Sequence, residues 1–414
     1  MMHTFNKIIS IRVPILGCFF ILLSDICPAQ HSSVHDFLSL DTVISFPNEK
    51  SNSCLLYAQW DRDLVFTNYH TSLNTDTVNC YIINVDDKKI EQTSLYKKGF
   101  CQMLKNLYTK TFGSMAYNKE FIAFYQAIGY GKGGIVYLFK RDDSLHFSFF
   151  QSIETDIDAS NIYFTDSCKL LLAKIHYYYG STLAVMDINS KKVTDIVHPY
   201  HNNKYMSNFV SNQYDAKNNL VLFANRNEYS FLTFDKNLRF SDSTGVKIKK
   251  WKNIPHKILK TISKSHNTDH DAANINFLLT DHYFKIHQLN KAYIIDSNKV
   301  LIAYTPAKRN IDKHYPTHVI NIWKKDNGVW NEIHGDIHDQ LGISDSIITR
   351  HSFGLDLISG HKTAVFPDKI VQIRENGTDF NPIGKTESQY YEYKDNFHAS
   401  NEPIIELRIF RHSF

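Results

Sequence analysis

Histidine and aspartate side chains crowd one short stretch of the chain. His266, Asp269 and His270 lie close together there. Zinc and manganese both accept imidazole and carboxylate ligands, so these residue types suit a metal site. The stretch is rich in Asn and flanked by Ser, and no predicted element holds the three side chains on one face. We therefore expect a solvated loop and predict no bound metal.

Tyrosine and basic residues recur in five segments that we expect to join the second and third strands of a repeated unit. Tyrosine rings stack on sugars and other flat ligands, and Arg and Lys bind carboxylate or phosphate. These segments predict a ligand-binding face, with the alternative that tyrosine is simply abundant, at 24 residues. The residues concerned are His70, Tyr130, Lys132, His176, Tyr178, Arg226, Lys308, Arg309, His314 and Tyr315.

A glycine motif in the same region matches a cofactor-binding pattern. Gly129, Gly131 and Gly134 have the GxGxxG spacing of dinucleotide-binding proteins. That pattern needs a helix after its last glycine, because the helix N-terminus holds the pyrophosphate. A predicted strand, 135–139, follows instead, so we interpret the motif as a hairpin connection. The sequence also lacks GxSxG, P-loop and HExxH motifs, and we predict no cofactor.

The elements that carry these segments follow a recurring phrase: an apolar run, an Asp or Asn, a turn, and a second apolar run. A recurring polar residue suggests a ligand, but a short polar side chain in a turn also caps the turn backbone, and we expect that role. A repeated strand–turn–strand unit of this size is typical of a β-propeller. The recurring residues are Asp61, Asn118, Asp166, Asp215 and Asp296.

The repeat predicts an all-β chain that folds as a single β-propeller of six, or alternatively seven, four-stranded blades. The second and third strands of each unit are near-continuous apolar runs, which predicts that neighbouring blades bury both faces. Residues 251–289 interrupt the rhythm. We expect a short amphipathic helix near 252–266, and two weak strands after it would supply a seventh blade. Residues 40–46 are expected to pair with the last unit and close the ring.

Two of the units resemble the FG-GAP or integrin-type repeats of the β-propeller superfamily. Residues 134–142 read Gly-x-Val-Tyr-x-Phe-x-Arg-Asp, an aromatic strand follows to residue 153, and residues 319–333 have a similar character. Members of those families often carry a calcium loop of alternating Asp residues with Gly. This chain has no such loop, so the resemblance implies the propeller fold without calcium binding or adhesion.

Charge and the first residues bear on partners and location. The formal net charge of +4 is too small for a nucleic-acid-binding face. Residues 1–29 predict a cleaved secretory signal, because Lys7 and Arg12 flank an apolar stretch that ends in small residues. The propeller would then occupy residues 30–414. Cys18 lies in a loose lipoprotein box, but the apolar run continues after it, so we do not expect lipidation.

Two further observations complete the expected location. No segment after the signal approaches the length of a transmembrane span, so we expect an exported protein that is periplasmic, at the cell surface or secreted. The signal aside, four cysteines remain, without the CxxC spacing of a zinc or redox site. We expect buried free thiols for most of them, although export permits disulfides. They are Cys54, Cys80, Cys101 and Cys168.

Two functions from different classes fit this sequence. The first is an exported binding or scaffold module that holds a protein or an anionic glycan on the loop face. The second is a polysaccharide-directed hydrolase or lyase, with loop His and Tyr side chains and carboxylates at the channel mouth. The missing catalytic motifs favour the first. Clustered His, Asp and Glu side chains at the channel mouth would favour the second.

Overall fold

The computed structural model describes an all-β chain. It describes residues 34–47, 54–69, 77–96, 113–128, 132–142, 146–174, 182–199, 213–217, 219–225, 230–242, 287–305, 319–338, 362–375 and 404–414. Within these segments the one helical element is a short 3-10 turn, η1 (Val34–Asp36). The expected signal (1–29) and the expected helix (252–266) lie outside them. Strand β18 begins at Gln288, so the end of the expected insert belongs to a strand.

The largest sheet has eight strands in two antiparallel halves, β2–β5 and β6–β9. The halves meet where β5 and β9 run parallel over three residue pairs, Ser94–Tyr96 against His146–Ser148. The strands are β2 (Cys54–Trp60), β3 (Asp63–Tyr69), β4 (Thr77–Asn84), β5 (Ile90–Tyr96), β6 (Ser114–Tyr117), β7 (Phe121–Ala127), β8 (Gly134–Arg141) and β9 (His146–Thr155).

The other four sheets have four strands each. Three of them are consecutive meanders: β10 (Asn161–Phe164), β11 (Lys169–Lys174), β12 (Thr182–Asp187) and β13 (Lys192–Val197); β14 (Gln213–Lys217), β15 (Leu220–Asn225), β16 (Ser230–Asp235) and β17 (Phe240–Asp242); and β18 (Gln288–Asp296), β19 (Lys299–Thr305), β20 (Val319–Asp326) and β21 (Val329–His338). The fourth contains β22 (Lys362–Val365), β23 (Lys369–Glu375), β24 (Ile404–His412) and β1 (Leu38–Pro47).

The fourth of these sheets joins the two ends of the described chain. Its order is β1-β24-β23-β22, so the first strand lies on the outside of the last unit. β1 pairs antiparallel with β24, with Leu40 opposite Phe410 and Phe46 opposite Ile405. The expected pairing of residues 40–46 with the last unit is confirmed. This pairing covers an edge strand that would otherwise expose free backbone groups.

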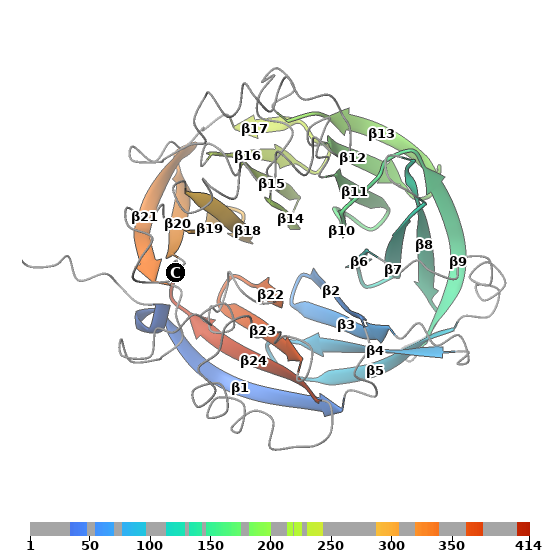
Figure 1. The fold of residues 1–414 in the computed structure, drawn as a ribbon, viewed down its shortest axis with the longest axis horizontal. Helices are drawn as coiled ribbons and strands as arrows, with labels where there is room; N and C mark the ends of the chain where they lie inside the picture. The colour runs from blue at the N-terminus through green and yellow to red at the C-terminus, as the bar shows by residue number, and fades with distance from the viewer. Residues whose placement is uncertain are drawn as a thin grey trace, which may run out of the picture.

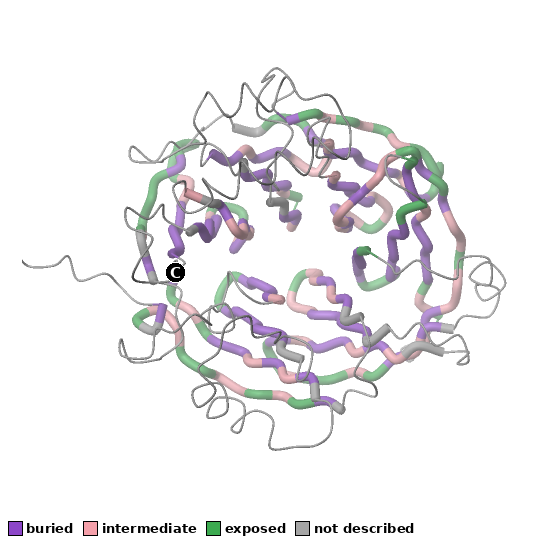
Figure 2. The backbone as a smooth tube through the Cα atoms, viewed as in Figure 1, coloured by how far each residue is buried: buried purple, intermediate pink, exposed green. Residues whose placement is uncertain are grey.

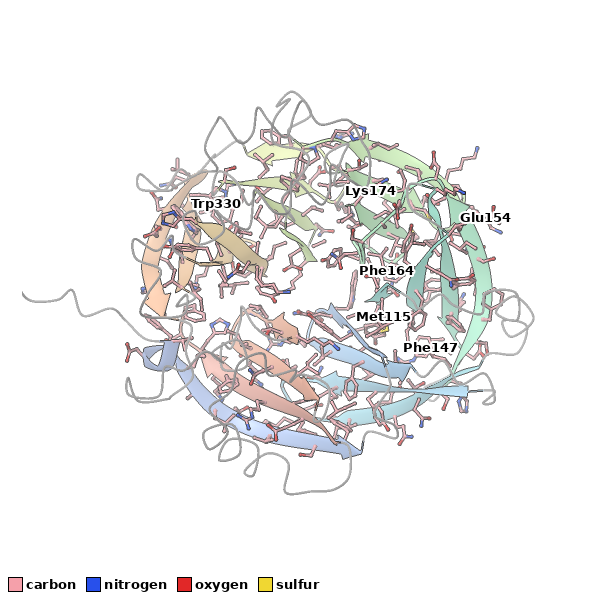
Figure 3. All side chains as sticks on the ribbon, viewed as in Figure 1. Met115, Phe147, Glu154, Phe164, Lys174 and Trp330 are labelled. Atoms are coloured by element: carbon pink, nitrogen blue, oxygen red, sulfur yellow. The ribbon has the colours of Figure 1, made fainter. Side chains whose placement is uncertain are left out.

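The sheets stand around a central opening, with β2, β6, β10, β14, β18 and β22 innermost (Figure 1). Buried apolar side chains fill the space between neighbouring sheets (Figure 3). Phe147 belongs to the cluster between β2–β5 and β6–β9, and Trp330 to the cluster between β14–β17 and β18–β21. Six such clusters follow one another, and the last joins the β22 sheet back to β2–β5. The packing is therefore continuous around the ring.

Burial decreases from the middle strands to the outer ones, as Figure 2 shows. The central four residues of β11 and of β12 are buried, whereas β13 alternates between exposed and half-buried positions. Packing on both faces explains the near-continuous apolar runs, as expected from the sequence. Among the described residues no helix has the length and apolar character that a membrane crossing requires.

Candidate functional site

The turns after the innermost strands are shaped by polar side chains. Asn118 Oδ1 accepts hydrogen bonds from the backbone N–H groups of Glu120 (2.9 Å) and Phe121 (2.7 Å). Asp166 Oδ1 accepts in the same way from Cys168 (3.0 Å) and Lys169 (2.8 Å). These bonds satisfy turn amides that strand pairing leaves free. The capping role expected for Asn118 and Asp166 is confirmed.

Two more of the recurring residues lie in turns, and one does not. Asp296 accepts from the N–H of Asn298 at 2.7 Å, and Asp61 adopts a positive φ of 52° at its turn. Asp215 was expected to cap a turn, and that expectation is wrong. It lies inside β14, buried, because the strand continues to Lys217 and the turn comes at Asn219, with φ 65°.

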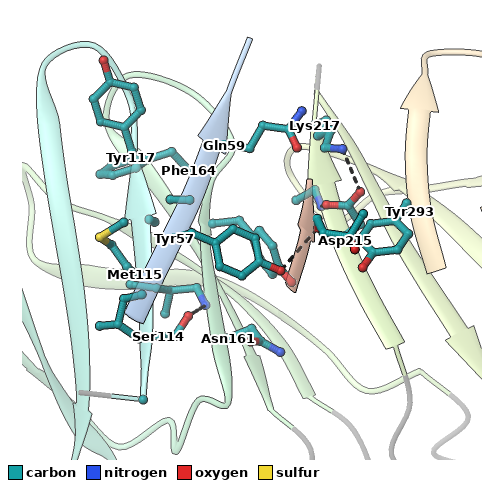
Figure 4. A pocket seen from close by; sticks show the side chains of 18 residues that line it. Tyr57, Gln59, Ser114, Met115, Tyr117, Asn161, Phe164, Asp215, Lys217 and Tyr293 are labelled. Carbon is teal, nitrogen blue, oxygen red and sulfur yellow. Dashed lines mark hydrogen bonds and ion pairs between the residues drawn. The ribbon is translucent and has the colours of Figure 1, made fainter. Parts of the chain in front are cut away.

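Asp215 is instead part of a buried ion pair beside the central channel (Figure 4). Its Oδ1 accepts from the N–H of Ala216 at 2.9 Å, and its Oδ2 accepts from the N–H of Ile294 in β18 at 2.7 Å. The Lys217 ammonium lies 3.3 Å from Oδ2, with only 12% of the lysine side chain and 9% of the aspartate side chain exposed. The carboxylate therefore has a partner for each oxygen and a counter-ion.

The Lys217 ammonium is also fully partnered. Besides Asp215, it donates to the backbone carbonyls of Ile294 (3.0 Å) and Val365 (2.6 Å). An ammonium has three protons to donate, and these three acceptors use all of them. Burial lowers the pKa of Lys217 below its usual value, although the Asp215 carboxylate acts in the opposite direction. The lysine thus ties β14 to β18 and β22 and is not poised as a nucleophile or base.

Two side chains from different inner strands meet on one carbonyl across the channel. Gln59 Nε2 in β2 donates to the Val365 carbonyl at 2.7 Å, and Lys217 donates to the same oxygen. We call Gln59, Lys217 and the Val365 carbonyl the latch. Gln59 and Lys217 line the pocket on each side of this point. The latch therefore lies where the two pockets meet.

The first pocket, which we call the loop-side pocket, has a volume of about 200 Å³. The first residues of two inner strands line it, namely Ser114 of β6 and Asn161 of β10. These pair with Tyr125 and Ala173, which lie near the ends of β7 and β11. The pocket therefore lies at the same end of the channel as the connections between second and third strands. Its other lining side chains include Tyr57, Gln59, Tyr163, Asp215, Lys217, Tyr293 and Thr363.

Hydroxyl and amide groups dominate the polar lining of the loop-side pocket. Tyr57 donates from its hydroxyl to the Thr363 carbonyl at 3.3 Å, and burial raises the pKa of Tyr57 to about 12. Ser114 Oγ accepts from the N–H of Ile162 at 3.0 Å. The Asn161 side chain, half-buried, makes no hydrogen bond to any described residue and lies beside the pocket in Figure 4. At neutral pH every lining group except the Asp215–Lys217 pair is therefore uncharged.

The second pocket, the turn-side pocket, has a volume of about 350 Å³ and lies among the turns after the inner strands. Trp60, Asp61 and Asp166 contribute to its wall. Arg62 at its edge is bound by two carboxylates, Asp86 and Asp368. Its guanidinium is therefore occupied by ion pairs within the protein.

The ligand-binding residues predicted from the sequence fall almost entirely outside the described residues. Lys132 is the exception: it is exposed, just before β8. The described strand ends that flank these residues lie at the loop-side end of the channel. The loop face itself lies outside the described residues and stays a prediction. Outside the described segments lie His70, Tyr130, His176, Tyr178, Arg226, Lys308, Arg309, His314 and Tyr315, and the metal candidates His266, Asp269 and His270.

The loop-side pocket, with its Asp215–Lys217 pair, is the feature that the sequence did not predict. The signal for it was present in the alternation of Asp215 and Lys217, because residues two apart in a strand face the same side. The pattern placed Asp215 in a turn, so Lys217 was not paired with it. The carbonyl partners come from residues 294 and 365, and no sequence pattern reports those contacts.

Comparisons with known proteins leave the family open. No protein-family model matches the chain, and no curated protein matches it. Among solved structures, an exported-protein candidate from Bacteroides fragilis NCTC 9343 is 13% identical with a TM-score of 0.49, over 94% of this chain and 98% of that one. The β-propeller domain of the Trilobed protease from Pyrococcus furiosus is 10% identical with a TM-score of 0.34, over 81% and 77%. Neither likeness assigns an activity to this chain.

Proposed function

We propose that this chain is an exported β-propeller of six four-stranded blades that binds a protein or an anionic glycan on its loop face. Six blades are supported by the packing between β14–β17 and β18–β21. Phe231 of β16 contacts Trp323 and Trp330 with ring centroids 6.1 Å and 5.3 Å apart. A seventh blade built from the insert would have to separate these sheets.

The observation that carries the binding function is the position of the loop-side pocket. It lies at the end of the channel where the second strands end and the third strands begin, and surface connections on a rigid scaffold commonly hold ligands. Lys132 supplies one exposed cation at this end. The other Tyr, His, Arg and Lys residues of the predicted face would surround the pocket and recognise carboxylate or phosphate groups.

The described carboxylates favour binding over catalysis. Asp215 is held by two backbone amides and Lys217, and Asp166 by two turn amides and by Lys236 at 3.6 Å. A general acid or base needs a carboxyl group that can reach a substrate proton. These two groups are committed to the fold. The hydrolase or lyase alternative therefore needs carboxyl groups other than these two.

A glycan array probed with residues 30–414 tests the proposed function. We expect binding to anionic glycans, and a loss of about tenfold or more when Tyr178 and Arg309 are both replaced by Ala, because stacking and charge pairing are removed together. Lys192→Ala on the outer strand β13 is the matched control and should bind as the wild type does. Unchanged binding of the double variant to every hit would refute the loop face.

The same hits discriminate the alternative function. Each bound glycan is incubated with the wild-type chain, and new reducing ends or unsaturated sugar products are measured. A binding module leaves the glycan intact. If the wild-type chain releases products steadily and the Tyr178→Ala, Arg309→Ala variant does not, the protein is a hydrolase or lyase and the binding function is wrong.

A further inference from the structure

The loop-side pocket ends at the latch, because Gln59 and Lys217 line both this pocket and the turn-side pocket. The latch lies across its floor: Gln59 and Lys217 both donate to the Val365 carbonyl, at 2.7 Å and 2.6 Å. These groups come from β2, β14 and β22, three separate inner strands around the ring (Figure 1). These hydrogen-bonded groups occupy the channel at the floor of the pocket, which favours a ligand that enters and leaves from the loop side. The end of a chain, or a small molecule, is such a ligand.

The size of the pocket limits what that end can be. Its volume is about 200 Å³. Sites for drug-sized molecules are larger, at roughly 300–1,000 Å³. One six-membered sugar ring, or one side chain, is the scale of ligand that fits.

The chemistry of the wall favours an uncharged polar ligand with an apolar face. Tyr57 and Tyr293 supply aromatic surface, and Asn161 supplies an amide that no described residue occupies. Asp215 and Lys217 neutralise one another and have their hydrogen-bonding capacity used within the protein. No unpaired charge among the described lining residues is therefore left to hold a free amino or carboxyl terminus.

We propose that the loop-side pocket binds one uncharged terminal sugar residue of the glycan that the loop face holds. This inference rests on the proposed function and adds a specificity: recognition of a chain end. Sugar rings stack their apolar face on tyrosine while their hydroxyl groups bond to amides and hydroxyls. A peptide terminus would bury an ammonium or carboxylate without a partner, which is costly. The wall therefore favours a sugar over a peptide.

Gly113 offers a way to fill the pocket without disturbing the fold. It lines the pocket, and a Cβ added there meets no atom within 4 Å. Gly113→Phe is therefore expected to add a ring at the wall of the pocket and reduce the space for a sugar. Glu154→Phe is the matched control, because Glu154 is exposed on the outer strand β9 and points away from the ring (Figure 3). Asn161→Ala is a second variant, which removes an amide without adding bulk.

Saturation-transfer NMR with methyl pyranosides (glucoside, galactoside, mannoside and N-acetylglucosaminide) supplies the readout. We expect at least one to bind the wild type with a dissociation constant in the millimolar range, which is usual for so few atoms. Gly113→Phe should abolish that signal and Asn161→Ala should weaken it about tenfold, whereas Glu154→Phe should keep it. Thermal unfolding of each variant checks that the fold is intact.

The results separate this inference from the proposed function. If the wild type binds glycans on the array but no pyranoside binds the pocket, the terminal-sugar site is refuted and the proposed binding by the loop face is not. Pyranoside binding that Gly113→Phe does not change would also overturn the terminal-sugar site. A tripeptide of uncharged residues with free termini serves as the competing probe. If it binds the wild type and not Gly113→Phe, the ligand of the pocket is a peptide terminus and not a sugar. Absence of any array hit with the wild type refutes glycan binding on the loop face, on which this inference rests.

Discussion

Replacing Lys217 by Met tests whether the latch stabilises the ring. Methionine fills nearly the same volume, so the change removes the ammonium and leaves the Asp215 carboxylate buried without its counter-ion. The lost interactions are the ion pair at 3.3 Å and the hydrogen bonds to the carbonyls of Ile294 (3.0 Å) and Val365 (2.6 Å). Breaking a buried pair from one side costs about 3–5 kcal/mol.

The low end of that range is expected here. Burial already lowers the pKa of Lys217, which means that the ammonium is costly to desolvate and that Met recovers part of this cost. Asp215 also keeps its two backbone amide donors. We therefore expect Lys217→Met to reduce the free energy of unfolding by about 3 kcal/mol. Urea unfolding followed by tryptophan fluorescence measures it, provided the slope of the transition is unchanged.

A second variant removes both charges and tests whether the cost of Lys217→Met comes from the unpaired Asp215 carboxylate. Asp215→Asn combined with Lys217→Met leaves no buried charge, so the double variant should be closer to the wild type than Lys217→Met alone, with a coupling of about 2 kcal/mol. Lys324→Met is the control, because Lys324 and Asp326 form an exposed pair at 3.1 Å that is worth at most about 1 kcal/mol. Strictly additive effects, or a cost for Lys217→Met no larger than for Lys324→Met, would refute the latch.

Three further predictions follow from buried polar groups. Burial lowers the pKa of His412, so below the usual histidine pKa the folded state binds fewer protons than the unfolded state. Stability should therefore fall as the pH drops from the usual histidine pKa to the lowered one. His412→Gln should make the urea midpoint depend less on pH over this range. Tyr125→Phe removes a hydroxyl that donates to the Ile157 carbonyl and accepts from the Ala159 N–H, both at 2.9 Å, and should cost about 1–3 kcal/mol in urea unfolding; a smaller loss would mean that water replaces it. Burial raises the pKa of Cys80 to about 12, so a thiol reagent at about pH 8 should label it only after unfolding, and Cys80→Ala should leave the native labelling unchanged; native labelling that falls would contradict its burial.

The strands of this fold could be predicted because short runs of apolar residues in the sequence indicate which strands are buried. The apolar runs around Leu170–Ala173 and Leu183–Met186 lie in β11 and β12, where both faces are covered. The Asp326-Asn327-Gly328 turn has residue types that tolerate positive φ, and Asn327 and Gly328 adopt it, at 50° and 81°. Short-range sterics and burial decide these features, and both are visible within a few residues.

The loop-side pocket could not be predicted because its hydrogen bonds join residues that are far apart in the sequence. Lys217 reaches carbonyls 77 and 148 residues away, and which carbonyls stand beside it depends on how the sheets are packed around the ring. The error at Asp215 has the same origin. Its neighbours resemble the other turns, but β14 begins at Gln213 and extends the strand past it. Pairing with β15, with Asp215 opposite Leu222, decided that extent.

The most direct test of chain-end recognition is a pair of titrations with one oligosaccharide that the array selects. One sample has its non-reducing end blocked by a bulky group, and the other has its reducing end blocked. The loop-side pocket predicts that blocking one of the two ends weakens binding at least about tenfold while blocking the other has little effect. Equal affinity of both blocked forms and of the unblocked oligosaccharide would contradict the account, because a chain that binds along its length does not need a free end.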